Sequence, residues 1–366
     1  MTQARWIAGQ ENLLRVPWRA RKLGSDVLSA AHYGTNLLVN RSRLHAGGKR
    51  RRLQFLIPFY GYTGGSFMTL SVANLLADDF LVSYRSHATN VMNKFVSRGV
   101  ILTRELDDSA DVCVVEGGED FEIIDRLRQN GTRIIVTMHG LPPTPDGLTT
   151  HGYEDDHIAK VMNLSTSIQY ITELQQPAVD NFGHVHHRLI RDFVWRVEKS
   201  TRTRNVGIVC DTTLKRKNIA VTLRSAELSE AERIHVWGRY ESRTSTERVH
   251  WHGFGKDKNE IFGSFDVLVH LSLVETQALV VLEAMSAGIP SVIADLPVYN
   301  YLAGVEGIWM VDPHDPEATA VAINEAFNCS AAVREGLRRH WERYHSPAVI
   351  RRQWIDYIDT VMEQPL

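Results

Sequence analysis

The stretch that decides the fold covers residues 265–296 and reads FDVLVHLSLVETQALVVLEAMSAGIPSVIADL. Its first part, residues 265–271, is an apolar run rich in Val and Leu, which is typical of a buried parallel strand. Residues 279–287 are expected to form a helix, ended by the Gly and Pro that follow, and residues 291–294 a second strand. This order predicts a strand–helix–strand (βαβ) unit.

Two acids mark the unit: Glu275 lies at the carboxyl end of the first strand, and Glu283 lies in the helix. In open α/β sheets, ligands bind at the carboxyl ends of strands. A helix amino terminus there offers backbone N–H groups and a positive dipole end, which suit a diphosphate. A carboxylate early in the helix can accept hydrogen bonds from two ribose hydroxyls. The turn that is expected to contact this ligand consists of Thr276, Gln277, Ala278 and Leu279.

With its flanking residues, the stretch resembles the E-x7-E signature of retaining GT-B glycosyltransferases, in particular family 4, the "group 1" glycosyltransferases. His270-Leu271-Ser272 precede the first acid, Leu282-Glu283-Ala284-Met285 contain the second, and Ala287-Gly288-Ile289-Pro290 follow. The resemblance implies an α/β GT-B fold, with two Rossmann-like domains facing each other across a cleft. It also implies a hexosyltransferase that moves a sugar from a nucleotide diphosphate sugar, such as a UDP-sugar, to an acceptor hydroxyl with retention of configuration.

Length and composition fit this class. A chain of 366 residues predicts two domains, and 43% hydrophobic with 23% charged residues is ordinary globular composition. The sequence contains no run of about 18 apolar residues, so no membrane span is expected. The amino terminus also lacks a compact apolar signal core. The three cysteines are far apart and odd in number, which favours a reducing compartment. We therefore expect a cytoplasmic protein, with peripheral attachment to a membrane as an open alternative.

Charge and pattern suggest the domain boundaries. Residues 1–52 hold eleven Lys and Arg against two acids, a net charge of +9, with Trp6 and Trp18 interleaved. Such a segment could lie on an anionic membrane, hold an acidic polymer or nucleic acid, or pack on the protein as an extension. With the roles that the resemblance implies, the expected order is a basic extension (1–52), an acceptor domain (53–195), a linker (196–204), a donor domain (205–345) and a helix crossing back to the first domain (346–366).

In the first domain, residues 53–60 are expected to form a buried strand, followed by the turn GYTGGS at 61–66 and a helix. A strand, a glycine turn and a helix amino terminus can bind an anion. The pattern is neither G-x-G-x-x-G nor a P-loop. It resembles the amino-terminal GG loop of the same glycosyltransferases, which implies that Gly64 and Gly65 let the donor diphosphate and the acceptor approach closely.

A histidine follows the clear strand at residues 133–138. Thr137-Met138-His139-Gly140 resembles the family's T-x-H-G strand end. The resemblance implies that His139 contacts the transferred sugar or helps to position the acceptor. Neutral imidazole can both donate and accept a hydrogen bond, which suits sugar hydroxyls.

The second domain is expected to open with the strand 205–210 and a basic loop. In the family this loop reads roughly G-R…K-G, and its cations grip the donor diphosphate; Lys217-Asn218 stands in the place of K-G, whereas Cys210 and Asp211 lie where Gly-Arg is expected. By the resemblance, Lys217 and Arg216 stabilise the leaving phosphate and Glu275 addresses the sugar. Cations suit a leaving group whose negative charge grows in the transition state.

A further strand is expected at residues 249–253 and ends at Gly253. By the resemblance, Gly253 and the next residue, Phe254, lie beside the nucleobase. Neither a metal nor another cofactor is expected, because lysine, arginine and the helix end supply positive charge to the donor, which is a substrate. The sequence leaves the acceptor open among a lipid carrier, a glycan, a small molecule, a protein and a nucleic acid.

Two alternatives remain at this point. The missing Gly-Arg, and Thr276-Gln277-Ala278 in place of the usual glycine-rich turn, favour a catalytically weak GT-B homologue that acts as a binding or scaffolding subunit. A GT-B epimerase or phosphorylase is the other alternative, although no motif indicates the pyridoxal phosphate lysine that a phosphorylase needs.

Overall fold

The computed structural model describes residues 50–57, 64–85, 93, 95–116, 121–140, 156–183, 185–199, 202–240, 244–255 and 257–365. Nearly all of the predicted basic extension lies outside these ranges, as do residues 58–60 of the strand expected at 53–60 and residues 61–63 of the glycine turn. The chain forms two compact units. One comprises residues 1–137, 164–166 and 364–366, and the other residues 138–163 and 167–363. The predicted domain boundaries stay a prediction.

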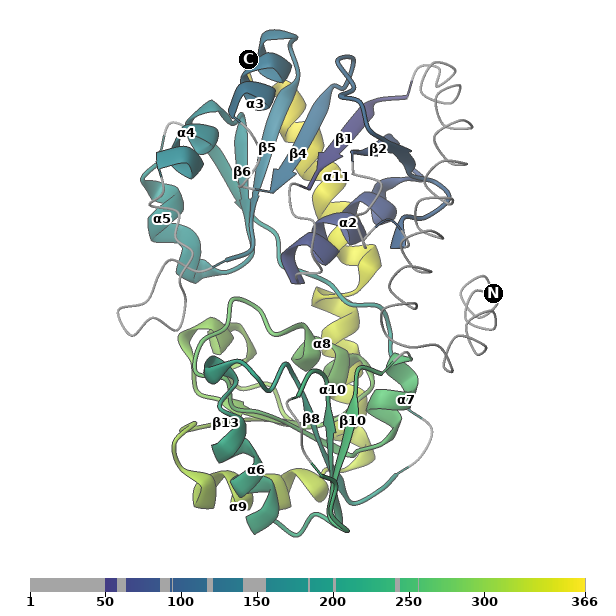
Figure 1. Cartoon of the computed structure of the whole chain (residues 1–366), viewed down its shortest axis with the longest axis vertical. Helices are drawn as coiled ribbons and strands as arrows, with labels where there is room; N and C mark the ends of the chain where they lie inside the picture. The colour runs from purple at the N-terminus through teal and green to yellow at the C-terminus, as the bar shows by residue number, and fades with distance from the viewer. Residues whose placement is uncertain are drawn as a thin grey trace. The chain divides into compact units, whose positions relative to one another are not determined.

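The first sheet is parallel and has seven strands in the order β3-β2-β1-β4-β5-β6-β7 (Figure 1). The chain moves outward from β1 to β3 and then returns to β4, so the strand order reverses between β1 and β4. This is the kind of position at which open sheets bind ligands. The strands are β1 (Arg52–Leu56), β2 (Leu81–Arg85), β3 (Ile101–Thr103), β4 (Val112–Glu116), β5 (Arg133–Met138), β6 (Ser167–Tyr170) and β7 (His186–Leu189).

The second sheet is also parallel, with six strands in the order β10-β9-β8-β11-β12-β13, so its order reverses between β8 and β11. Gly207 of β8 packs closely against the ring of Phe265. A Cβ at this position would come within 2.1 Å of the ring, so the contact requires glycine. The strands are β8 (Asn205–Val209), β9 (Arg233–Trp237), β10 (Val249–Gly253), β11 (Val267–His270), β12 (Ser291–Ala294) and β13 (Ile308–Val311).

Helices separate many of these strands along the chain. They are α2 (Gly64–Leu76), α3 (Phe121–Gln129), α4 (Asp156–Leu164), α5 (Gln176–Asp180), α6 (Ile219–Leu228), α7 (Lys258–Gly263), α8 (Leu279–Ser286), α9 (Pro316–Phe327), α10 (Ala331–Tyr344) and α11 (Pro347–Glu363). Three short 3₁₀ helices are η3 (Glu173–Gln175), η4 (Lys215–Lys217) and η5 (Pro297–Leu302).

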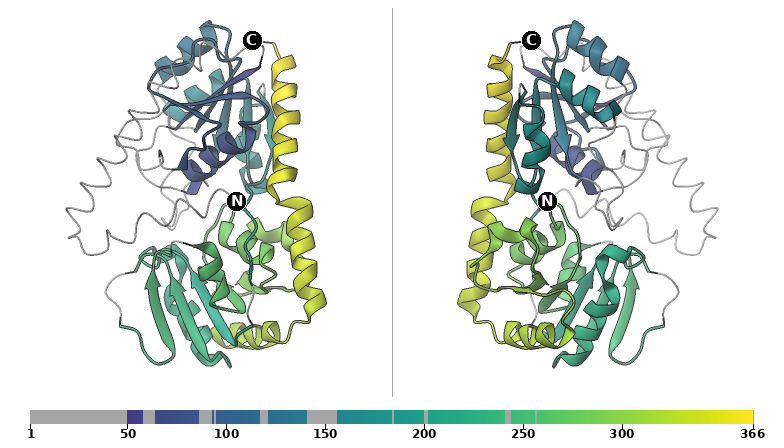
Figure 2. Two further views of the ribbon diagram at one scale, coloured as in Figure 1. Left: turned by 90° about the vertical axis from the view of Figure 1, so that its right-hand side faces the viewer. Right: turned by 90° about the vertical axis from the view of Figure 1, so that its left-hand side faces the viewer.

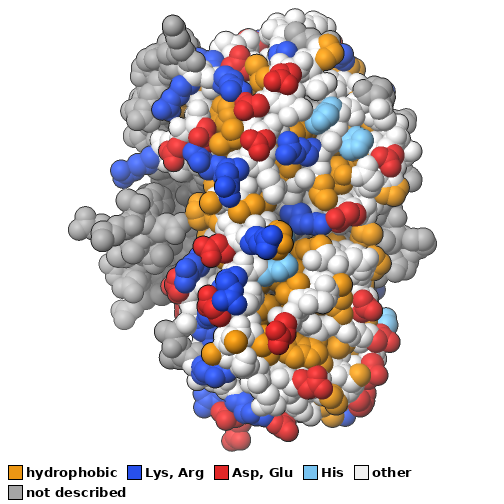
Figure 3. Space-filling model, turned by 180° about the vertical axis from the view of Figure 1, so that it is seen from behind, with side chains coloured by type: hydrophobic (Ala, Val, Ile, Leu, Met, Phe, Trp, Pro, Cys, Tyr) orange, Lys and Arg blue, Asp and Glu red, His pale blue; other side chains and the backbone are white. Residues whose placement is uncertain are grey.

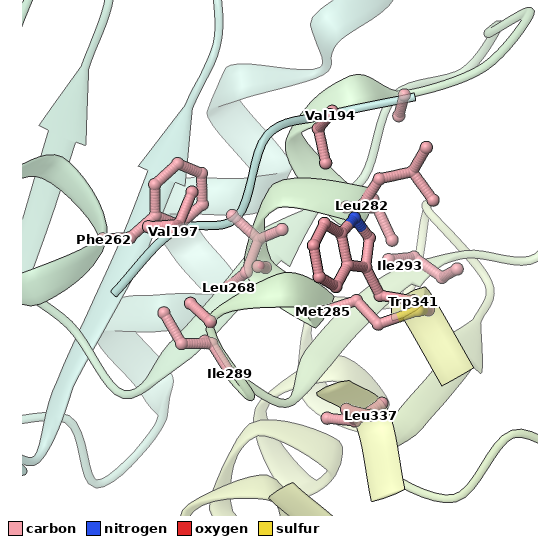
Figure 4. Close-up of a cluster of buried hydrophobic side chains, with 14 of the residues drawn as sticks. Val194, Val197, Phe262, Leu268, Leu282, Met285, Ile289, Ile293, Leu337 and Trp341 are labelled. Atoms are coloured by element: carbon pink, nitrogen blue, oxygen red, sulfur yellow. The ribbon is translucent and has the colours of Figure 1, made fainter. Parts of the chain in front are cut away.

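Strand β11 is buried on both faces. Leu268 packs in a cluster that contains Met285 of α8 and Trp341 of α10 (Figure 4). Its neighbours Val267 and Val269 point to the opposite face and belong to a second cluster, which includes residues of α9. Because both faces exclude water, the strand is continuously apolar rather than alternating, as the sequence indicated.

Helix α11 lies alongside the last strands of the first sheet (Figure 2). The hydroxyl of Tyr357 donates to Ser167 Oγ of β6 at 2.6 Å, and its ring stacks on His186 of β7 with the centroids 6.0 Å apart. The side chain is fully buried. These contacts attach the last helix to strands far from it in sequence.

On the face shown in Figure 3, basic and acidic side chains are interspersed. None of the helices in the described ranges combines the length and the apolar character that crossing a membrane requires.

The predicted α/β fold with two parallel sheets is confirmed. The strands expected at 112–116, 133–138 and 291–294 match their observed bounds. The sequence analysis missed β3, which has only three residues, and β7, whose sequence HHRL is polar and half-buried. The apolar run in β3 is short, and β7 has none, whereas strand prediction depends on such runs.

Candidate active site

Glu275 lies in the turn between β11 and α8, at the carboxyl edge of the second sheet and next to the point where strand order reverses. It is buried, with 8% of its surface exposed. Lys217 Nζ forms an ion pair with Glu275 Oε1, and Arg216 Nη1 lies 3.6 Å from the same oxygen. The structure thus brings three of the predicted catalytic residues together.

Two further side chains complete this group, which we call the Glu275 cluster: Arg216, Lys217, His270, Ser272 and Glu275. His270 Nε2 lies 3.2 Å from Glu275 Oε1, and Ser272 Oγ lies 3.1 Å from the same ring nitrogen. Both side chains are buried. The sequence analysis quoted them within the family phrase but did not predict them as site residues.

The cluster keeps its acid ionised. Burial alone would raise the pKa of the Glu275 carboxyl, but Lys217, His270 and Arg216 together hold it well below its usual range. Burial also lowers the pKa of His270, so that its imidazole is neutral near neutral pH. A neutral ring with its proton on Nε2 donates to Glu275.

The loop that carries the two cations is joined to the Glu275 turn. The N–H of Leu273 donates to the carbonyl of Arg216 at 2.8 Å, and Arg216 Nη1 donates to the carbonyl of Val274 at 3.3 Å. Asn218, which stands where the family has glycine, adopts a left-handed conformation with φ 50° and ψ 41°. Asparagine is one of the few residues that tolerate this region, so the substitution preserves the loop.

The place of the expected Gly-Arg is occupied by Cys210, which supplies no positive charge. Burial raises the pKa of its thiol to about 11, so the group stays protonated. Within the described residues, the cations that reach the Glu275 carboxylate are therefore Lys217 and Arg216.

Helix α8 begins beside this turn. Its N-cap residue, Ala278, makes no side-chain hydrogen bond, so no capping side chain satisfies the N–H groups of the first turn. Glu283 of α8 is largely buried and forms an ion pair with Lys258 of α7. The ion pair with Lys258 therefore fixes the position of the Glu283 carboxylate.

Gln277 and His139 both lie next to Asp192, which the sequence analysis did not place in the site. Gln277 Oε1 accepts from the backbone N–H of Asp192 at 2.8 Å, and its Nε2 donates to the Asp192 carbonyl at 3.4 Å. His139 Nδ1 lies 3.8 Å from Asp192 Oδ1. Burial lowers the pKa of His139 to about 4, so the ring is neutral near neutral pH.

The predicted nucleobase residues lie at the end of β10. Gly253 has a positive φ of 74°, and Phe254 exposes 78% of its surface. Thr276 and Leu279 are half-buried in the turn and first residue around the start of α8.

The predicted residues Gly64 and Gly65 form the first turn of α2, in the other compact unit. Next to them, Ser66 Oγ donates to Oε2 of Glu116 at 3.0 Å. Glu116 ends β4 and exposes 8% of its surface; burial raises its pKa to about 7. The sequence analysis missed this acid, although a Glu that ends the apolar run VCVV is a visible signal.

No group of three or more His, Cys, Asp and Glu side chains is arranged to hold a metal ion within the described ranges.

Residues 203–328, which contain the Glu275 cluster, match the family "Glycosyl transferases group 1". No curated protein sequence matches the chain.

Several solved structures are similar. Sucrose-phosphate synthase from Thermosynechococcus elongatus has a TM-score of 0.66 and 14% identity, over 85% of this chain and 99% of that one. Anabaena HepE in complex with UDP-glucose has a TM-score of 0.65 and 13% identity, over 84% and 99%. Staphylococcus aureus TarM, in a complex that contains UDP, has a TM-score of 0.57 and 16% identity, over 70% and 56%.

The chain therefore has the GT-B fold, and its residues 203–328 are similar to the family "Glycosyl transferases group 1".

Proposed function

We propose that the chain is a retaining glycosyltransferase that moves a hexose from a UDP-sugar to an acceptor hydroxyl. The observation that carries this proposal is the convergence of Lys217 and Arg216 on the buried, ionised Glu275, beside the amino terminus of α8. A diphosphate leaving group needs cations and backbone N–H groups where its charge develops.

The bond between sugar C1 and the diphosphate oxygen breaks, and a bond from C1 to the acceptor oxygen forms on the same face. The leaving phosphate takes the acceptor proton. Lys217 and Arg216 offset the charge that grows on the phosphate, and Glu275, with His139, addresses the sugar. Because these residues supply the positive charge, the proposal requires no metal.

The proposed donor carries uridine as its base. HepE and TarM were solved in complexes that contain UDP-glucose or UDP, which favours uridine as the base. Glu283 is proposed to accept hydrogen bonds from the ribose hydroxyls. Its ion pair with Lys258 orients the carboxylate for this role.

Calorimetry tests the proposal directly, with UDP, GDP, ADP, dTDP and UDP-glucose as ligands. We expect UDP to bind the full chain more tightly than the other nucleoside diphosphates, and Glu283→Ala to weaken its binding on the order of tenfold, about 1.4 kcal/mol. Glu260→Ala is the matched control, because Glu260 is an exposed acid on α7; it should bind as the wild type does.

The stereochemistry is tested separately, by following the anomeric proton of the sugar released from UDP-glucose. An α product from this α-linked donor supports retention, and a β product contradicts it.

If none of the nucleotides bound in the calorimetry, the result would instead support the alternative of a binding or scaffolding subunit.

A further inference from the structure

The turn after Glu275 departs from the family pattern in a way that the structure explains. Where the resemblance predicts a glycine-rich turn, this chain has Gln277, and its side chain is buried. Both ends of its carboxamide engage one residue: Oε1 accepts from the N–H of Asp192, and Nε2 donates to the carbonyl of Asp192. Glycine could make neither contact.

Asp192 in turn faces the predicted catalytic histidine. Its Oδ1 lies 3.8 Å from Nδ1 of His139, and both side chains are largely buried. Another charged group nearby, Arg191, is engaged elsewhere: it pairs with Glu173, and its guanidinium lies 4.2 Å from the centroid of the Tyr301 ring. Within the described part of the chain, the carboxylate of Asp192 thus lies beside Nδ1 of His139.

We propose that Asp192 and Gln277 are positioning residues for His139. Gln277 holds the backbone of Asp192, and the carboxylate of Asp192 holds the imidazole of His139 as the tautomer protonated on Nδ1. This inference rests on the proposed function only in assigning the sugar as the group that His139 meets.

The physical reason lies in the two nitrogens of a neutral imidazole. One carries the proton and donates, and the other carries a lone pair and accepts. A carboxylate beside Nδ1 favours the proton there, as acids beside site histidines commonly do. Nε2 of His139 then carries the lone pair, so that it accepts a hydrogen bond from a sugar hydroxyl. The opposite tautomer would donate at Nε2 and reverse the polarity of that contact.

NMR of the full chain with ¹⁵N-labelled histidine tests the tautomer without donor or acceptor. His139→Gln identifies the signals of His139 by their loss. In the wild type at pH 7 we expect the long-range ¹⁵N–¹H correlations to show a protonated Nδ1. Asp192→Asn should shift the ring toward the Nε2-protonated tautomer, and Gln277→Met should do so partly. Gln129→Met, on the exposed end of α3, is the control and should change nothing.

A wild-type His139 protonated on Nε2, or a tautomer that Asp192→Asn leaves unchanged, would overturn the inference. If Asp192→Asn does not fold, Gln277→Met, which leaves the carboxylate in place, decides the matter alone. Because the spectra need no substrate, they separate this inference from the proposed function. If transfer is observed, both variants should lower kcat on the order of 10–100-fold with the KM for UDP-glucose nearly unchanged.

Discussion

Two buried glutamates occupy corresponding places in the two sheets. Glu116 ends β4, which lies beside β1, and Glu275 follows β11, which lies beside β8; in both sheets the strand order reverses there. Each residue has 8% of its surface exposed. Yet burial raises the pKa of Glu116 to about 7, whereas the pKa of Glu275 is held well below its usual range.

The difference shows that partners, and not burial, decide the charge of each acid. Burial raises the pKa of both carboxyls. Against it, Glu116 has the hydroxyl of Ser66, a neutral donor, whereas Glu275 has Lys217, His270 and Arg216. The second sheet thus places an ionised acid among cations, where an anionic leaving group is proposed to bind. The first sheet holds an acid that titrates near neutral pH.

Removing the main cation should have the largest effect on this comparison. Lys217→Met leaves Glu275 with the weaker partner Arg216 and removes the proposed phosphate contact. We expect turnover of UDP-glucose to fall on the order of 10²–10³-fold, about 3–4 kcal/mol. Steady-state release of UDP measures it. Lys215→Met, an exposed lysine two residues away, is the control; equal activity in both variants would show that Lys217 does not act on the donor.

Replacing the acid of the first sheet should change stability with pH. The raised pKa of Glu116 means that folding favours its protonated form, so the stability that it contributes is present below about pH 4.5 and is lost as pH rises through 7. Glu116→Gln keeps an acceptor for Ser66 and removes the charge. Relative to wild type, this variant should gain up to about 3 kcal/mol of unfolding free energy between pH 4.5 and 8.

Urea unfolding at a series of pH values checks this expectation. Glu122→Gln, at an exposed acid in the first turn of α3, is the control. If the difference between Glu116→Gln and wild type did not change with pH, Glu116 would titrate as an ordinary carboxyl, and the contrast with Glu275 would fail.

The smallest effect is expected for the second cation. Arg216 is more exposed than Lys217 and lies farther from the carboxylate. Arg216→Gln should therefore reduce UDP-glucose turnover only about tenfold, about 1.4 kcal/mol. Measured beside Lys217→Met, it ranks the two cations; a loss larger than that of Lys217→Met would reverse the ranking that the structure gives.

Local sequence determined much of this protein. Apolar runs predicted the buried strands β4, β5, β11 and β12, because a strand covered on both faces must be apolar throughout. Short-range patterns also placed Glu275 after β11, Glu283 in α8 and the basic loop around Lys217 after β8. These features depend on residues that are neighbours along the chain.

The tertiary structure alone decided which distant residues meet. Lys217 lies 58 residues from Glu275, and Gln277 lies 85 residues from Asp192. No local period links such pairs, because the sheet topology brings them together at one edge. For the same reason, the sequence could not predict the partners of the two acids. Among the described residues, Glu275 has two cations beside it, whereas Glu116 has a hydroxyl group. A carboxyl's charge depends on the groups that folding places around it, and the sequence near the carboxyl does not contain them.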